Sequence, residues 1–268
     1  GISFASKTVL RLGVGLLGAR ITAAQIVALG PMPVLLVTTT MAATIGCGLL
    51  AARLFGRHWT FGLLTGGAVA ICGASAALAI AAVLPQRDDI EENTLFTVVA
   101  VTSLSTIAMI VYPMVFSALG FDDVQMGILF GATIHDVAQV VGAGYAVSDG
   151  AGDMATFVKL MRVALLPVVL LAIIAFAPRG KNAGRVQFPS FVLLFAALVV
   201  LNSIGAIPTA VSAALSDASR WMLIVAIAAL GVKTALKKMV ALGGGHFAIV
   251  VGLTVFLATI ATVAIGFA

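Results

Sequence analysis

Nine long apolar stretches follow one another along this chain, with few charged residues between them. A helix of about 20 apolar residues crosses the roughly 30 Å hydrocarbon core of a bilayer. Of the 268 residues, 62% are apolar and 9% are charged, whereas soluble domains carry about 25% charged residues. A water-exposed globule is therefore excluded, and unbroken apolar runs disfavour a membrane β-barrel, whose strands alternate. The sequence predicts an all-α polytopic membrane protein.

The expected membrane helices leave no linker long enough to separate soluble domains. They cover residues 4–17, 32–54, 60–84, 94–119, 127–147, 154–176, 188–204, 221–240 and 246–267. One set of alternating loops holds seven basic residues: Arg53, Arg57, Arg179, Lys181, Arg185, Lys237 and Lys238. The opposite set holds three: Arg20, Arg87 and Arg220. Because basic loops stay in the cytoplasm, we expect the N-terminus inside and the C-terminus outside.

Two segments of the chain suggest an internal repeat. Residues 6–18 (SKTVLRLGVGLLG) and 157–169 (FVKLMRVALLPVV) each carry a Lys, an Arg one turn later and an apolar run. A Gly-rich helix follows each at a similar distance, and the matched helices lie five apart, so they would cross the membrane in opposite senses. Inverted repeats with interrupted helices are typical of secondary transporters. The predicted division is residues 1–120, incomplete at the N-terminus, and residues 124–268.

The Gly-rich centre of the third expected helix (GGAVAICGASA) is a candidate anion site. Glycine relaxes the demand for helical backbone, and Ser75 can cap a new helical start. A break near Cys72 and Gly73 would turn the amides of Gly73, Ala74 and Ser75 toward a cavity, with the partial positive charge of a helix N-terminus. Close helix packing through small residues is the alternative interpretation.

The eighth expected helix supplies a second candidate break, beside Gly231. An interruption there would place the Lys233 ammonium and the Thr234 hydroxyl near the midplane, opposite the first break. The alternative is that Lys233 extends to the membrane surface beside Lys237 and Lys238.

Charges inside membrane helices are costly and mark functional candidates. Apart from Arg53, Lys237 and Lys238 at helix ends, the charged residues of the expected helices are Lys7, Arg11, Asp136, Lys159, Arg162 and Lys233. Asp136 and Gln139 share a helix face, and His135 titrates near neutrality, so a proton relay is one interpretation. A buried ion pair of Asp136 with Arg11 or Arg162 is another. Metal ligation is disfavoured because no second His lies within reach along the helix.

Four segments resemble the bacterial YeiH-like family: residues 7–22 (KTVLRLGVGLLGARIT), 70–82 (AICGASAALAIAA), 131–144 (GATIHDVAQVVGAG) and 228–238 (AALGVKTALKK). That family is named for sulfate export and placed among the cation–proton antiporters and anion transporters. The resemblance implies two inverted five-helix repeats, two interrupted helices that cross, and a place in the bacterial inner membrane. Members usually begin with further membrane helices, so the resemblance implies that an N-terminal part is missing here.

Together these features predict a secondary active transporter of a small anion, sulfate or an organosulfonate, working by alternating access. The expected anion-binding residues are Cys72, Gly73, Ala74, Ser75, Gly231, Lys233 and Thr234. The expected ion-coupling or structural residues are His135, Asp136, Gln139, Arg11 and Arg162. A proton or sodium ion would drive transport; neither a cofactor nor nucleic acid is expected, and a homodimer stays open.

Two alternatives to this function remain at the level of sequence. A proton- or sodium-coupled transporter of another metabolite, such as a carboxylate, would share the same fold. An ion channel would use the Gly-rich segments as its filter. An enzyme is disfavoured because the sequence has no Walker loop, H-E-x-x-H or G-x-S-x-G.

Overall fold

The computed structural model describes residues 8–19, 22, 24, 31–85, 87–176, 190–233 and 244–267. These residues form helices and no strands, which confirms the all-α prediction for the described ranges. The helices are α2 (Leu10–Leu16), η2 (Leu17–Ala19), α4 (Met32–Leu54), α5 (Trp59–Ala70), α6 (Ala74–Val83), α7 (Ile90–Ala118), α8 (Asp123–Thr133), α9 (Val137–Val147), α10 (Asp149–Ala164), α11 (Leu166–Phe176), α12 (Ser190–Ser203), α13 (Thr209–Lys233) and α14 (Gly244–Gly266).

Within the described residues, four helical segments are each long and apolar enough to cross a bilayer as a single helix. They are Met32–Leu54, Ile90–Ala118, Asp149–Ala175 and His246–Gly266. The third joins α10 to α11, where the Leu165 amide donates to Met161 O at 3.3 Å. Pro167 follows at the second position of α11, where a missing amide donor is tolerated. The shorter helices need partners to span the same thickness.

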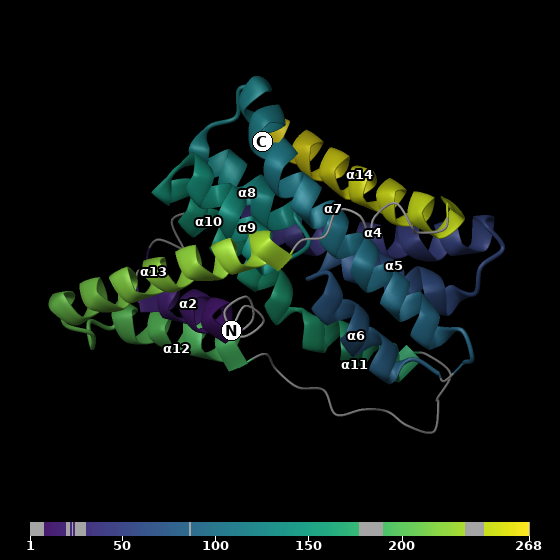
Figure 1. Ribbon diagram of the computed structural model, residues 1–268, viewed down its shortest axis with the longest axis horizontal. Coiled ribbons are helices and arrows are strands. Elements are labelled where there is room, and N and C mark those ends of the chain that lie inside the picture. The colour runs from purple at the N-terminus through teal and green to yellow at the C-terminus, as the bar shows by residue number, and fades with distance from the viewer. Residues whose placement is uncertain are drawn as a thin grey trace.

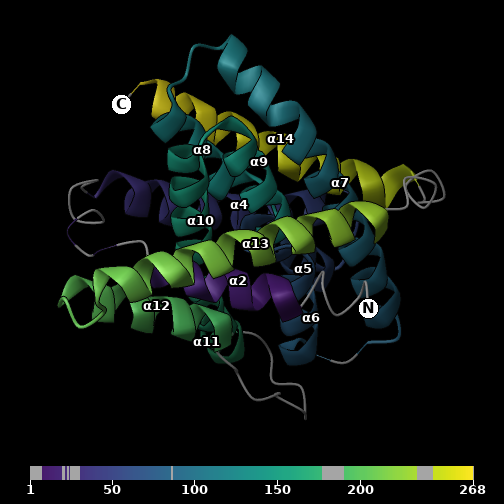
Figure 2. The same cartoon turned by 60° about the vertical axis from the view of Figure 1, so that its left-hand side comes forward.

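Two groups of helices make up the described part of the molecule (Figure 1). The central group consists of α4 to α11 with α14, and the side group consists of α2, η2, α12 and α13. Figure 2 shows α13 lying along α2, with α12 on the far side of α2. The Ser212 hydroxyl donates to Ala19 O at 2.8 Å, and the Ser219 hydroxyl donates to Gly13 O at 2.6 Å. These bonds tie α13 to α2 and η2 through groups that apolar lipid could not satisfy.

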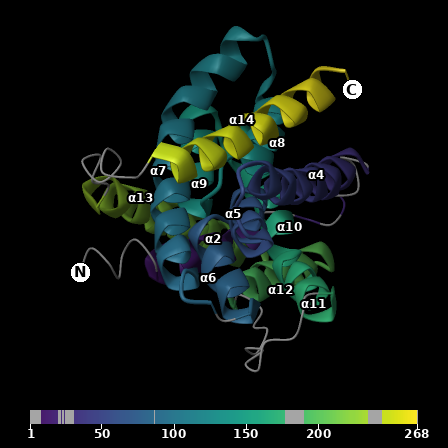
Figure 3. The same ribbon diagram turned by 90° about the vertical axis from the view of Figure 1, so that its right-hand side faces the viewer.

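Glycines let α4 and α5 pack with their backbones almost in contact. A Cβ on Gly48 of α4 would lie 2.6 Å from the Gly62 carbonyl oxygen and 2.8 Å from Gly66 Cα on α5. In Figure 3 these two helices lie beside α14, which crosses the same group above them. Small residues at helix interfaces are the usual basis of close packing in membranes. The small-residue alternative for the Gly-rich segment therefore describes part of α5.

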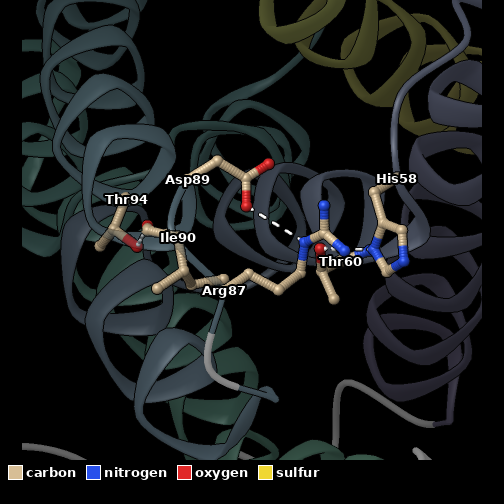
Figure 4. A network of polar contacts seen from close by, with 6 residues as sticks. All are labelled: His58, Thr60, Arg87, Asp89, Ile90 and Thr94. Atoms are coloured by element: carbon tan, nitrogen blue, oxygen red, sulfur yellow. Dashed lines mark hydrogen bonds and ion pairs between the residues drawn. The ribbon is translucent and has the colours of Figure 1, made fainter.

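Polar side chains lie at the beginnings of α5 and α7 (Figure 4), and they cap α5 but not α7. His58 Nδ1 lies 2.9 Å from the Thr60 hydroxyl and accepts from the Thr60 amide at 3.4 Å. Arg87 Nε lies 3.1 Å from Asp89 Oδ1, and both side chains are exposed. An exposed ion pair contributes at most about 1 kcal/mol to the free energy of unfolding, so this pair adds little to the stability of the protein.

Several expected helices have different boundaries in the structure. Residues 60–84 and 127–147 are each divided into two helices. α13 begins at Thr209 rather than Trp221, so Arg220 lies inside a helix and is not a loop residue. α13 also continues through Gly231 to Lys233, and the predicted interruption at Gly231 is therefore wrong. Thr234 lies outside the described residues, as does the side chain of Lys233.

Candidate functional site

The first interruption in a membrane helix lies between α5 and α6, as predicted. Ile71 ends α5 with φ −115° and ψ −85°. Gly73 follows with φ 63° and ψ −122°, a combination that residues with a Cβ rarely adopt. The Gly73 amide donates back to Ala68 O at 2.8 Å. The chain thereby turns through three residues and starts a new helix at Ala74.

The second interruption lies between α8 and α9, inside the segment that the sequence led us to expect as one helix. Ile134 and Asp136 both have extended backbones, with ψ values of 135° and 143°. α9 then begins at Val137, capped by Asp136, whose Oδ1 accepts from the Ala138 amide at 2.9 Å. The first interruption lies in the first half of the predicted division, 1–120, and the second lies in the other half, 124–268. The inverted five-helix arrangement itself stays a prediction.

The two interruptions meet in the interior of the central group. A Cβ on Gly73 would lie 3.4 Å from His135 Cβ, in van der Waals contact. His135 Nδ1 lies 3.2 Å from Val69 O in α5, and its Nε2 lies 3.0 Å from the Thr254 hydroxyl of α14. His135 is fully buried. One side chain at the second break therefore links it to the first break and to α14.

Two buried cations on α10 hold the carbonyl ends of both interrupted helices. Lys159 Nζ donates to Ile71 O at 2.7 Å and to Ile134 O at 2.9 Å. Its side chain is fully buried. Breaking a helix leaves carbonyls without partners, and unpaired backbone groups are especially costly where no water reaches them. Lys159 supplies one donor to each break.

Arg162 lies one turn further along α10 and also donates to backbone carbonyls of the interrupted helices. Its Nε donates to Ala70 O at 2.9 Å, and its two terminal nitrogens reach Val69 O and Gly131 O, each at 3.0 Å. The side chain is 1% exposed. A guanidinium suits this position because its planar fork presents five donors in fixed directions. The C-terminal ends of α5 and α8 carry partial negative charge, which these two cations offset.

The N-terminal ends of α6 and α9 lie at the first and the second break. Gly73, at the cap of α6, makes no side-chain cap, and Ser75 in the first turn is exposed. The two C-terminal ends carry partial negative charge and the two N-terminal ends carry partial positive charge, so these four partial charges roughly cancel. With their usual charges, Lys159, Arg162 and Asp136 together leave one positive charge. The crossing is therefore electrostatically suited to a small anion.

The Asp136 carboxylate has a different partner from the Arg162 side chain that was one of the two expected. Arg162 is directed to carbonyls, and Asp136 Oδ1 accepts from the Ala138 amide at 2.9 Å. The backbone amide of Asp136 donates to the Ser105 hydroxyl of α7 at 2.9 Å. The predicted ion pair with Arg162 is therefore wrong. The side chain of Arg11 lies outside the described residues, so its predicted role stays open.

The structure brings together most of the residues that the sequence singled out. Cys72 and Gly73 lie at the first break, and His135, Asp136 and Gln139 lie at or just after the second. Lys159 was noted only as an intramembrane charge, and its role as a helix cap was missed. The second break was also missed, although Asp136 followed by Gln139 three residues later is the signature of a helix start. That signal lay inside an apolar run and was interpreted as a polar turn of a continuous helix.

Sequence comparisons place this chain among bacterial membrane proteins. The family described as "Conserved hypothetical protein 698" matches residues 1–265. "UPF0324 membrane protein TauZ" of Paracoccus denitrificans is 51% identical over 98% of this chain and 80% of its own length. "UPF0324 membrane protein CT0845" of Chlorobaculum tepidum is 51% identical over 97% of this chain and 74% of its own length. A relative from Bacteroides thetaiotaomicron is 33% identical over 96% of the chain and 79% of its own length.

No solved structure matches the chain. The family match is nearly complete, and the relatives align over most of both chains. Their names agree with the apolar helices of the structure in describing a membrane protein. The chain belongs to the family described as conserved hypothetical protein 698, together with the UPF0324 membrane proteins.

Proposed function

We propose that the protein is a secondary transporter of a small anion, with sulfate or an organosulfonate as the first candidates, working by alternating access. The observation that carries this proposal is the meeting of two interrupted helices at Gly73 and His135. Interrupted helices of this kind are costly in a membrane, and transporters use them to bind substrates and ions near the midplane. A scaffold protein gains nothing from them.

The proposed anion site lies at the start of α6, on the amides of Ala74 and Ser75. The bound anion would be stabilised by the helix N-terminus and by the single positive charge left at the crossing. The proposed site therefore keeps Cys72, Gly73, Ala74 and Ser75 and replaces the Gly231 segment with the break at His135 and Asp136.

Alternating access requires two parts that move relative to each other. The central group, which holds the crossing, is the proposed fixed substrate carrier, and the side group of α2, η2, α12 and α13 is the proposed moving panel. Internal hydrogen bonds hold the side group together. An open-sided apolar cavity of about 270 Å³ lies between α10 and α12, and its lining includes Leu160 and Ala196.

We further propose that the resemblance to the YeiH-like family extends to the superfamily architecture and to the bacterial inner membrane. The C-terminus would then lie outside the cytoplasm. Transport rather than catalysis, coupled to a proton or sodium ion, completes the proposal.

Counterflow in proteoliposomes tests this function directly. Vesicles containing the purified protein and unlabelled sulfate should accumulate labelled sulfate in a saturable way, and empty vesicles should not. The same assay with sulfonates and with dicarboxylates identifies the preferred substrate. Accumulation of dicarboxylates alone would favour the carboxylate alternative. Unsaturated flux with single-channel currents would contradict a carrier and favour a channel.

A further inference from the structure

Two helices of this protein begin with the same residue pair and use it differently. α8 starts after Asp122, with Gln125 at its third position. The Asp122 side chain accepts from the Gln125 amide at 2.8 Å, and Gln125 Oε1 accepts from the Asp122 amide at 3.1 Å. This reciprocal arrangement is a capping box, in which both side chains serve the helix end. α9 starts after Asp136, with Gln139 at the same third position.

In α9 the two side chains do not form a capping box, because Ser105 accepts the hydrogen bond that Gln139 would accept in one. The Asp136 amide donates to the Ser105 hydroxyl of α7 rather than to Gln139. Gln139 Nε2 reaches the Thr106 hydroxyl, also on α7, at 3.4 Å. Gln139 is fully buried, and its Oε1 has no hydrogen-bond partner among the described residues.

The contacts around Thr106 leave one atom of the Gln139 carboxamide without a partner. The Thr106 hydroxyl donates to Thr102 O at 3.1 Å and accepts from Gln139 Nε2. Gln139 Oε1 is therefore the free acceptor among the described residues. A buried acceptor without a partner is costly, and a buried acceptor left unpaired beside a functional crossing calls for an explanation.

We propose that Gln139 Oε1 and the Asp136 carboxylate bind a sodium ion. Both are hard oxygen ligands, and such ligands suit cations of this kind. A single carboxylate matches a monovalent ion better than a divalent one. Asp136 Oδ1 also caps the Ala138 amide, so the site lies where the extended residues after α8 lead into α9.

The charges at the crossing connect this site to the anion. Lys159 and Arg162 are directed to carbonyls rather than to Asp136, and the crossing as a whole carries one positive charge. Adding sodium alone raises that charge, whereas adding it together with an anion does not. Sodium and the anion should therefore strengthen each other's binding, and this coupling is reciprocal. The binding site stands on its geometry, but its role in coupling rests on the proposed transport function.

Thermal unfolding of the purified full chain in detergent tests the sodium site without any transport assay. At constant pH and ionic strength, replacing choline chloride by sodium chloride should raise Tm by a few degrees, because a ligand that binds only the folded state stabilises it. The same increment should disappear in Asp136→Asn and in Gln139→Leu. Gln139→Glu, which keeps an oxygen ligand, should retain it.

Gln125→Leu is the matched control, because it removes the same residue type from the same helix position in α8. It should lower Tm in both salts while leaving the sodium increment intact. In choline chloride, Gln139→Leu should be at least as stable as the unmodified protein, because it removes an unpaired acceptor. If Gln139→Leu does not fold, Asp136→Asn and Gln139→Glu still decide the matter.

Three outcomes would overturn the sodium site. They are an equal Tm in sodium and choline for the unmodified protein, an increment unchanged in both Asp136→Asn and Gln139→Leu, and stabilisation by lower pH alone. The last would assign Asp136 to a proton instead. Sulfate counterflow without a sodium increment would refute this site and leave the proposed transport function standing. A sodium increment without any counterflow would support the sodium site and contradict the proposed transport function.

Discussion

Gly73 is the residue at which the backbone of the first interruption turns, and its φ of 63° with ψ −122° explains why a glycine is found there. Gly73→Ala should destabilise the protein by about 1–3 kcal/mol, the usual cost of a sparsely populated backbone conformation. The expected cause is strain rather than collision, since the nearest atom to the added Cβ would be His135 Cβ at 3.4 Å. Thermal unfolding measures the loss. Gly73→Val should abolish sulfate counterflow as well.

Gly252→Ala is the matched control for that change. Gly252 lies in α14 with helical backbone, and no atom lies within 4 Å of its added Cβ. Alanine there should raise stability by up to about 1 kcal/mol, because glycine is a poor helix former. Equal Tm values for the two alanine variants would contradict the strain at Gly73.

Arg162 allows a second test at the scale of single residues. Arg162→Lys keeps the charge but loses the fork, so at least one of the carbonyls of Val69, Ala70 and Gly131 would be left without a donor. The expected loss of stability is about 1–3 kcal/mol, the cost of an unsatisfied buried group. Arg53→Lys, on the exposed last turn of α4, should change Tm very little. Comparable Tm values for both variants would show that the fork is dispensable.

The chemistry at the first break could be predicted from the sequence better than the partners of its residues. Gly73 was identified because glycine is the residue that relaxes helical backbone, a local property. The expected ion pair of Asp136 with Arg162 was wrong because Arg162 is bound to broken-helix carbonyls. Those carbonyls exist only once both breaks have formed, so the competition between carboxylate and carbonyl is a tertiary effect.

At the scale of elements, length and apolarity predicted the long helices and concealed the second break. α4 matches the expected residues 32–54. α8 and α9 have 11 residues each, and joined they look like one ordinary membrane helix. An apolar run does not distinguish a continuous helix from two half-helices, because both bury the same surface. The prediction of a break at Gly231 is wrong for the converse reason, since a glycine permits an interruption of a helix without requiring one.

The contact between α4 and α5 gives a prediction for element packing. Gly48→Ala should separate the two helices and lower Tm, because its Cβ would meet the Gly62 carbonyl oxygen at 2.6 Å. Overpacking of this kind costs about 1–3 kcal/mol. Gly46→Ala on the same helix is the control, since nothing lies within 4 Å of its Cβ. Since alanine is the better helix former, Gly46→Ala should leave Tm unchanged or raise it. A loss at Gly46 equal to that at Gly48 would mean that the contact with α5 is not the cause.

At the scale of the whole molecule, the apolar cavity between α10 and α12 lies where the two groups of helices would slide. Ala196→Trp should fill this space and slow sulfate counterflow while leaving the concentration for half-maximal flux unchanged. Ala197→Trp is the control, because Ala197 has the same residue type on the same helix but is not among the residues that line the cavity. Both variants should keep a normal Tm. Equal rates in the two variants would place the moving surface elsewhere.

α10 joins the two interrupted helices through its two buried cations. Lys159 binds the carbonyls of Ile71 and Ile134, directly after α5 and α8, and Arg162 binds those of Ala70 and Gly131 within them. Moving either broken helix along its axis would therefore break several hydrogen bonds at once unless the other moved with it. For the proposed transport of an anion, the consequence is that the two breaks should move as one unit past the side group, with their crossing kept intact.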